Sequence, residues 1–235
     1  MIDIHSHFLP LVDDGPKTLA GSMAILKALA EQGVTDVIAT PHFVPETNYV
    51  SSRIQNLRVL AVVRDKMKEK KIRINVYLGN ELYIDRKIAM LVKTRMISSL
   101  ADSQYLLVEL PLDGEYPNYK DIFMDLLGAG YKVILAHPER YTTFQKDFGL
   151  VEEMQRVGLL FQCNIASIIG KYGKRAKKTV RKMIKKKMVF TFGSDIHHAG
   201  KSDYILLSQK KLSKYYNRNE LKELLVTNPG KIIGR

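Results

Sequence analysis

Apolar and polar positions alternate between two patterns along the chain. Short apolar runs predict strands, and stretches with apolar residues every three or four positions predict the helices between them. Strands are expected at residues 2–4, 34–39, 72–78, 105–110, 133–136, 159–163 and 188–192. Helices are expected at residues 19–31, 51–70, 86–94, 119–127 and 150–156, in the basic stretch after the sixth strand, and near residues 220–225.

Seven strand-and-helix units in alternation predict an α/β fold with a parallel sheet. Their number favours a closed, seven-stranded β/α barrel of the TIM-barrel type. The alternative is an open doubly wound sheet, but no glycine-rich nucleotide loop follows the first strand. No linker, repeat or low-complexity tract divides the sequence, so residues 1–235 are expected to form one domain.

Composition indicates a globular enzyme of the cytoplasm. Apolar residues make up 46% of the chain and charged residues 26%. No apolar run approaches the ~20 residues of a membrane span, and the N-terminus lacks the features of a signal peptide. Cys163 is the single cysteine, and six residues later the chain has Ile169 in place of the arginine of a cysteine-dependent phosphatase loop. We therefore expect Cys163 to be a buried strand residue.

Much of the net charge of +13 lies in residues 171–187. Val180, Met183 and Ile184 give this segment a narrow apolar stripe, so the simpler interpretation is a helix with a solvated basic face. The alternative is an electrostatic binding site for a phosphorylated tail, nucleic acid or anionic lipid. Aromatic residues that could stack on bases are scarce here, and no stable nucleic-acid partner is expected.

Histidines carry the clearest chemical signal. Of six in the chain, five lie just beyond the end of a predicted strand: His5, His7, His42, His137 and His197. The carboxylates of Glu81, Glu109 and Asp195 occupy similar strand-end positions. In a β/α barrel all strand carboxyl ends open onto one face, where active sites form.

Spacing within these motifs points to metal binding. Residues two apart in an extended strand point the same way, so His5 and His7 can face one ion, as can Asp195 and His197. Imidazole with carboxylate suits Mn²⁺, Fe²⁺ or Zn²⁺, and a set this large suggests two or three ions. The structural alternatives are ordinary rim carboxylates at Glu81 and Glu109, a turn at residues 13–14, and a surface ion pair at Arg140.

At these residues the chain resembles the polymerase-and-histidinol-phosphatase (PHP) family, and most closely its manganese-dependent protein tyrosine phosphatases, which act with capsule and exopolysaccharide synthesis in bacteria. The matching motifs run in the family's order across nearly the whole chain: Ile2-Asp3-Ile4-His5-Ser6-His7, Asp13-Asp14-Gly15, Thr40-Pro41-His42, Glu81, Leu107-Val108-Glu109, Ala136-His137-Pro138-Glu139-Arg140 and Gly193-Ser194-Asp195-Ile196-His197.

The resemblance implies a distorted seven-stranded barrel that holds three metal ions, with Mn²⁺ as the expected metal. The ligands it implies are His5, His7, Asp14, His42, Glu81, Glu109, His137, Asp195 and His197. It gives Arg140 the role of binding phosphate. The family's phosphatases usually carry a second arginine after the last ligand pair, and here Lys201 is the candidate substitute, without a bidentate fork.

The function implied by the resemblance is dephosphorylation of a protein tyrosine phosphate, with the tyrosine-rich tail of a bacterial tyrosine kinase as the expected partner. Three alternatives remain open at this point. They are a small-molecule phosphatase of the histidinol-phosphate type, a metal-dependent nuclease that uses the basic charge, and a non-enzymatic binding module.

Overall fold

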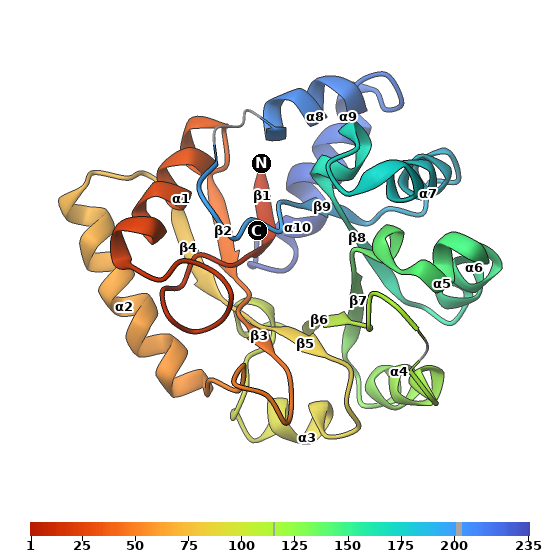
Figure 1. The fold of residues 1–235 in the computed structure, drawn as a ribbon, viewed down its shortest axis with the longest axis horizontal. Helices are drawn as coiled ribbons and strands as arrows, with labels where there is room; N and C mark the ends of the chain where they lie inside the picture. The colour runs from red at the N-terminus through yellow and green to blue at the C-terminus, as the bar shows by residue number, and fades with distance from the viewer. Residues whose placement is uncertain (115, 201–203) are drawn as a thin grey trace.

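Parallel strands surround a common axis, and helices cover them on the outside (Figure 1). The computed structural model describes residues 1–114, 116–200 and 204–235. Its strands are β1 (Ile2–Ser6), β2 (Asp36–Ala39), β3 (His42–Phe43), β4 (Asn75–Leu78), β5 (Glu81–Tyr83), β6 (Tyr105–Glu109), β7 (Lys132–Ala136), β8 (Leu160–Asn164) and β9 (Thr191–Gly193). They form two sheets of order β1-β2-β4 and β3-β5-β6-β7-β8-β9, with every pairing parallel.

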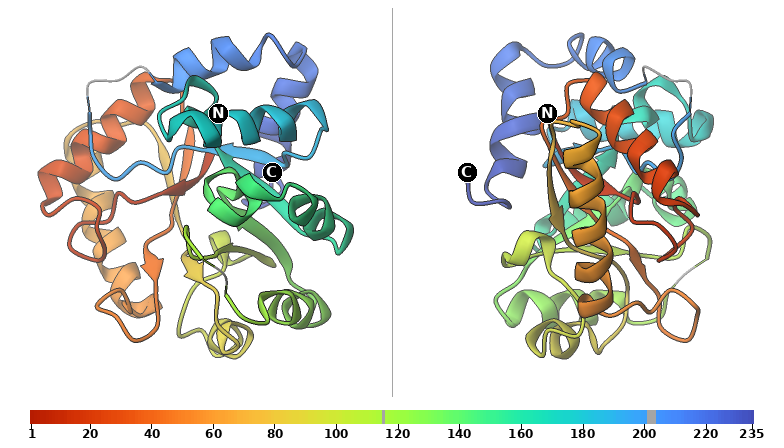
Figure 2. Two further views of the ribbon diagram at one scale, coloured as in Figure 1. Left: turned by 45° about the vertical axis from the view of Figure 1, so that its right-hand side comes forward. Right: turned by 90° about the vertical axis from the view of Figure 1, so that its left-hand side faces the viewer.

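Helices connect successive strands and then close the chain. The α-helices are α1 (Leu19–Glu31), α2 (Arg53–Glu69), α3 (Ile88–Lys93), α4 (Tyr119–Gly128), α5 (Thr142–Lys146), α6 (Gly149–Arg156), α7 (Gly173–Lys185), α8 (Tyr204–Leu212), α9 (Arg218–Lys222) and α10 (Asn228–Gly230). Shorter turns are η1 (Leu100–Asp102), η2 (Pro138–Arg140), η3 (Ile165–Ile169) and the π-helical η4 (Glu223–Thr227). Two further views show how the helices ring the strands (Figure 2).

The predicted fold class is confirmed, but the described residues form nine strands where seven were expected. The two extra strands, β3 and β5, lie just beyond the ends expected for two strands, at residues 39 and 78. Thr40 and Pro41 separate β2 from β3, and Gly79 and Asn80 separate β4 from β5. Pro41 has no N–H group for the ladder, and a Cβ on Gly79 would lie 2.8 Å from the Leu100 side chain.

The ring closes between the first and last strands. Ser6 and Ile196 form an isolated parallel bridge. The amide of His7 donates to the carbonyl of Ile196 at 3.0 Å, and the amide of Asp195 donates to the carbonyl of His5 at 2.9 Å. The seam therefore passes through the two segments that carry the His-X-His and Asp-X-His motifs.

Alternation along the strands separates two apolar clusters. On β6, Tyr105 and Leu107 belong to a small cluster made by strands, η1 and the C-terminal residues. Leu106 and Val108 belong to a larger cluster that lies between the strands and the helices. These layers hold the strand ends in place, which fixes the side chains that follow them.

Local signals explain several helix boundaries. The Thr18 side chain accepts the amide of Gly21 at the start of α1, and Ser52 and Gln55 form a capping box at α2. In α7 the predicted stripe is buried and the basic positions face outward, which confirms the helix expected there. Among the described residues, none of the helices combines the length and apolar character needed to cross a bilayer.

Candidate metal centre

All nine side chains expected as metal ligands converge at the carboxyl ends of the strands. They come from β1 and the loop after it, from β3, β5 and β6, and from the residues that follow β7 and β9. Seven of them form three overlapping groups, and within each group the ligand atoms lie within 4.8 Å of one another. The other two, His137 and Asp195, lie within ion-pair distance of Glu81 and His5, respectively. The groups are His5, His7 and Glu81; His42, Glu81 and Glu109; and His7, Asp14, His42 and His197.

Glu81 lies at the centre of this arrangement and is fully buried. Its Oε2 is 3.1 Å from Nε2 of His5, 3.3 Å from Nε2 of His7 and 3.1 Å from Nδ1 of His42. Its Oε1 is 2.9 Å from Nε2 of His137. One buried carboxylate that contacts four imidazoles differs from an ordinary rim residue, which favours a ligand role for Glu81.

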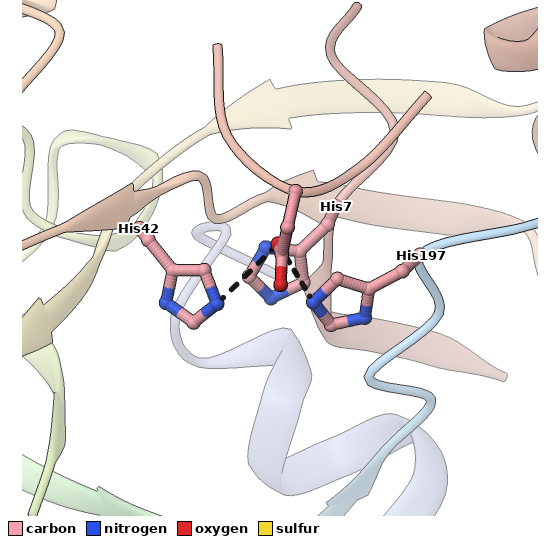
Figure 3. Close-up of side chains that lie close together, drawn as sticks. His7, His42 and His197 are labelled. Atoms are coloured by element: carbon pink, nitrogen blue, oxygen red, sulfur yellow. Dashed lines mark ion pairs between the residues drawn. The ribbon is translucent and has the colours of Figure 1, made fainter. Parts of the chain in front are cut away.

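The half-exposed Asp14 carboxylate belongs to the group nearest to solvent. Its Oδ1 is 3.2 Å from Nε2 of His197 and 3.6 Å from Nε2 of His42. Figure 3 shows His7, His42 and His197 close together, with ion pairs from His42 and His197 drawn as dashed lines. The ring of His7 stacks on that of His197. This group is the most exposed of the three.

The tautomers of His5 and His7 test whether the site fits a metal. Nδ1 of His5 lies 2.7 Å from the amide oxygen of Gln162, and Nδ1 of His7 lies 2.8 Å from Oδ2 of Asp13. Both partners are acceptors, so both Nδ1 atoms carry the hydrogen. The two Nε2 lone pairs then face each other across 3.2 Å, which is favourable only with a cation between or beside them. The donor set fits a metal.

The pKa shifts of His7, His42 and Asp195 all favour the charged form of the side chain. Burial opposes the charged form of His7, but the Asp13 and Glu81 carboxylates outweigh it and hold its pKa well above the ordinary value. For His42 burial is likewise outweighed by Glu81 and Glu109, and its pKa rises to about 9. Burial of Asp195 is outweighed by the histidines, and its pKa falls to about 2. Without a metal, the centre retains protons in its place.

Strand β8 supplies two polar side chains that sequence reasoning missed. Gln162 accepts from His5, and Nδ2 of Asn164 donates to Oδ2 of Asp195 at 2.6 Å. The two amides are joined by a 3.0 Å hydrogen bond. Their signal in the sequence is two polar residues at alternate positions of an otherwise apolar strand. They fix the orientation of ligands without adding one.

Cys163, between these two amides, is fully buried as expected. Burial holds the pKa of its thiol well above the ordinary value. A buried protonated thiol is inert as a nucleophile.

Arg140 lies beside the centre and is not an isolated surface residue. Nη1 donates to Oδ2 of Asp195 at 2.7 Å, and the guanidinium lies 4.7 Å from the ring centroid of Tyr172. The neighbouring cation Lys171, which sequence reasoning also missed, has its amine 4.5 Å from the Tyr204 ring. Lys201, the expected second phosphate-binding cation, lies outside the described residues.

Comparison with known proteins assigns the family. The family model for capsular polysaccharide synthesis, CpsB/CapC, matches residues 1–234. The chain belongs to the CpsB/CapC family. It is 33% identical to the putative tyrosine-protein phosphatase CapC of Staphylococcus aureus, over 94% of this chain and 87% of that protein. It is 29% identical to the tyrosine-protein phosphatase CpsB of Streptococcus pneumoniae, over 99% and 98% of the two chains.

Solved structures agree with this assignment. A structure from a study of YwqE from Bacillus subtilis and CpsB from Streptococcus pneumoniae, described as metal-dependent tyrosine phosphatases, superposes with a TM-score of 0.89. It is 27% identical and covers 100% of this chain and 94% of that one. A phosphotriesterase homology protein from Escherichia coli, 16% identical with a TM-score of 0.64, shares the fold and covers 98% and 97% of the two chains. The resemblance drawn from the motifs is confirmed.

Proposed function

We propose that this member of the CpsB/CapC family is a metal-dependent protein tyrosine phosphatase, and that the histidine and carboxylate centre is its active site. The observation that carries the proposal is the facing Nε2 pair of His5 and His7 around Glu81, with Arg140 at the edge. Its relatives CapC, YwqE and CpsB are named tyrosine-protein phosphatases, which favours phosphotyrosine over other phosphoesters.

The residues that would hold the metals are His5, His7, Asp14, His42, Glu81, Glu109, His137, Asp195 and His197. Imidazole and carboxylate donors without thiolate suit Mn²⁺, Fe²⁺ or Zn²⁺, and the resemblance to manganese-dependent phosphatases favours Mn²⁺ in this proposal. When bound, such ions lower the pKa of water and neutralise charge on a phosphoryl group. The three overlapping groups support two or three ions that share ligands.

Arg140 binds the phosphate of the substrate in this mechanism. Its guanidinium has donors beyond the one that Asp195 accepts, and the Tyr172 ring limits its rotation. Charge-assisted hydrogen bonds from the fork orient the phosphoryl group and offset the charge that spreads over its oxygens in the transition state. Because a tyrosine phenolate has a pKa near ~10, its departure needs little help from a general acid.

The substrate of this proposal is a phosphotyrosine-bearing protein, and the family's link to capsular polysaccharide synthesis supports the tail of a bacterial tyrosine kinase. Dephosphorylation of that tail would regulate capsule or exopolysaccharide synthesis.

The test compares one metal-stripped preparation before and after Mn²⁺ is restored, with phosphate release from a phosphotyrosine peptide as the readout. Activity that returns with the metal supports the proposal. Histidinol phosphate and single-stranded DNA serve as parallel substrates. Faster release from histidinol phosphate, or metal-dependent cleavage of the DNA with no release from the peptide, would overturn the phosphotyrosine assignment.

A further inference from the structure

Helix α7 presents a face of uncompensated positive charge. Its sequence contains no acidic residue, and its cations are Lys174, Arg175, Lys177, Lys178, Arg181, Lys182 and Lys185. Ala176, Thr179, Val180, Met183 and Ile184 are buried against the rest of the protein. Five of the cations are exposed on the opposite side, and Lys177 and Arg181 are half-buried. Exposed helices usually relieve such repulsion with acidic residues one turn away, and α7 has none.

Neighbouring elements neutralise this face only at its edge, where Glu152 of α6 interacts with Lys182. In the part of the chain that the structure describes, the ion pairs of this segment are Lys186 with Glu152 and Lys187 with Glu220, and both lysines follow the last helical residue. Lys182 lies 4.0 Å above the Phe148 ring. Most of the positive charge of α7, which includes the exposed Lys174, Arg175 and Lys178, is therefore available to a partner.

Two hollows flank the ridge formed by Lys178 and Lys182. One, of about 480 Å³, lies between α5 and α7 and includes Gln145 and Phe148. The other, of about 620 Å³, extends toward Tyr215. Each combines cations with an aromatic ring, a mixture suited to an anionic chain that also has carbon-rich side chains.

The first hollow is connected to the backbone of Arg140 through Gln145. Nε2 of Gln145 donates to the carbonyl of Glu139 at 2.9 Å and to that of Arg140 at 3.3 Å. Tyr172 contacts the Arg140 guanidinium and immediately precedes α7, and Lys171 stands next to it. The ribbon views place α5 and α7 next to each other at this edge of the barrel (Figures 1 and 2). Positive charge thus continues from the metal centre along α7.

We propose that α7 binds the residues that flank the phosphotyrosine in an anionic peptide segment of the substrate, whose acidic side chains or further phosphotyrosines contact its cations. This inference rests on the proposed function, and it further specifies that the substrate segment around the phosphotyrosine is negatively charged. A 13-residue helix is about 20 Å long, which matches about six residues of extended peptide. The continuity with Arg140 favours a peptide held in the active site over a lipid surface.

The test uses the Mn²⁺-loaded protein and two phosphotyrosine peptides of equal length, one flanked by Glu and Asp and the other by Gln and Asn. The variant Lys174→Glu/Lys178→Glu reverses two exposed charges on α7. The matched control, Lys70→Glu/Arg73→Glu, makes the same charge change at two exposed positions between α2 and β4, on another side of the barrel.

We expect kcat/KM for the acidic peptide to fall on the order of tenfold at low salt in the α7 variant, through KM, with kcat unchanged. The neutral peptide and the α2 control should change by less than about twofold. Added salt should weaken the preference of the wild-type protein for the acidic peptide, because screening acts on exposed charges.

Equal rates on the two peptides, or equal losses in both variants, would overturn the inference. Anisotropy of the labelled acidic peptide provides a readout that needs no turnover. If neither peptide is hydrolysed, the proposed function fails, while tight binding that is lost in the α7 variant still supports the inference. Flotation with phosphatidylglycerol vesicles is the last arm, and vesicle binding that depends on Lys174 and Lys178 without any peptide preference would assign α7 to a lipid surface instead.

Discussion

His5 and His7 direct their Nε2 atoms at each other across 3.2 Å, each held in place by an acceptor at Nδ1. With both lone pairs directed at each other, the two buried Nε2 atoms are stabilised by a cation or a proton between or beside them. Protons provide part of this stabilisation in the metal-free protein, as the raised pKa values of His7 and His42 indicate. Metal binding and protonation are consequently competing reactions at one site.

Metal binding should strengthen as pH rises from 6.5 to about 9. The pKa of His42 rises from 6.5 to about 9 on folding without metal, so its protonation stabilises the metal-free fold below pH 6.5. That contribution disappears as pH rises through about 9. Each proton displaced costs about tenfold in affinity per pH unit below the pKa. The Mn²⁺-induced rise in Tm should therefore grow across this window.

Calorimetry in two buffers of different ionisation enthalpy would count the protons released on Mn²⁺ binding. A Mn²⁺ affinity that does not depend on pH, with no proton release, would contradict competition between metal and protons.

The contribution of Asp195 to stability depends on pH in the opposite direction. Its pKa falls to about 2 from 3.8, so its stabilisation is present above pH 3.8 and is lost as pH falls through about 2.

Replacing Gln162 with Leu should reduce metal affinity by about 10- to 100-fold. Leucine keeps the approximate volume but cannot accept from Nδ1 of His5, so the imidazole loses its fixed tautomer. Gln162→Glu restores an acceptor at that position and should recover part of the affinity. Mn²⁺ titration followed by thermal unfolding provides the measurement, and equal affinities in the wild-type and Leu proteins would remove the orienting role.

The substitution Arg140→Lys should lower kcat/KM on the order of 100-fold while metal content is retained. Lysine keeps the charge but lacks the fork that can bind phosphate while Asp195 accepts a hydrogen bond. Arg140→Ala should reduce activity further. Metal analysis of both purified variants accompanies the kinetics, because loss of metal together with activity would make Arg140 a structural residue of the centre.

The exchange Gly193→Ala should destabilise the protein by about 1–3 kcal/mol. An added Cβ would lie 2.8 Å from Cβ of His5 and 2.9 Å from Nε2 of Gln162, both in the buried centre. Gly128→Ala, at the end of α4 with nothing within 4 Å, is the matched control and should leave stability nearly unchanged. Urea unfolding measures the effect, and the midpoint of Gly193→Ala should be lower than that of Gly128→Ala. Similar midpoints would show that the strand accommodates the extra carbon.

Thiol-alkylating reagents should leave activity intact in the native protein. Cys163 is fully buried on β8 and burial raises the pKa of its thiol. Mass spectrometry should find no adduct before denaturation. Rapid inactivation coupled to modification of Cys163 would require a different account of the chemistry.

Sequence periodicity predicted the positions of the ligands better than the lengths of the strands. The expectation at residues 188–192 is displaced to β9 (Thr191–Gly193), because the amide of Met188 donates to the carbonyl of Met183 and completes the end of α7. Met188 is buried all the same. An apolar run records burial, and the backbone partner decides whether it becomes a strand.

Eight of the nine candidate ligands were predictable because histidine and carboxylate at strand ends mark the open face of a barrel. Asp14 was expected only from the family resemblance. Gln162 and Asn164 were not predicted, since a neutral amide carries no chemical signature until its partner is known. Lys171 was likewise assigned only to the charge of its segment. Its position above the Tyr204 ring and beside Tyr172 depends on contacts between distant parts of the chain.

The closing seam between Ser6 and Ile196 has a consequence for when the metal site can form during synthesis of the chain. His7 and His197 share a ligand group although they lie near opposite ends of the sequence. A ribosome must release most of the chain before this pocket can exist, so a nascent segment cannot trap metal there early. Once formed, an ion shared by both ends would bind the folded chain and not the unfolded one, so it would stabilise the fold by an amount that grows with the metal concentration.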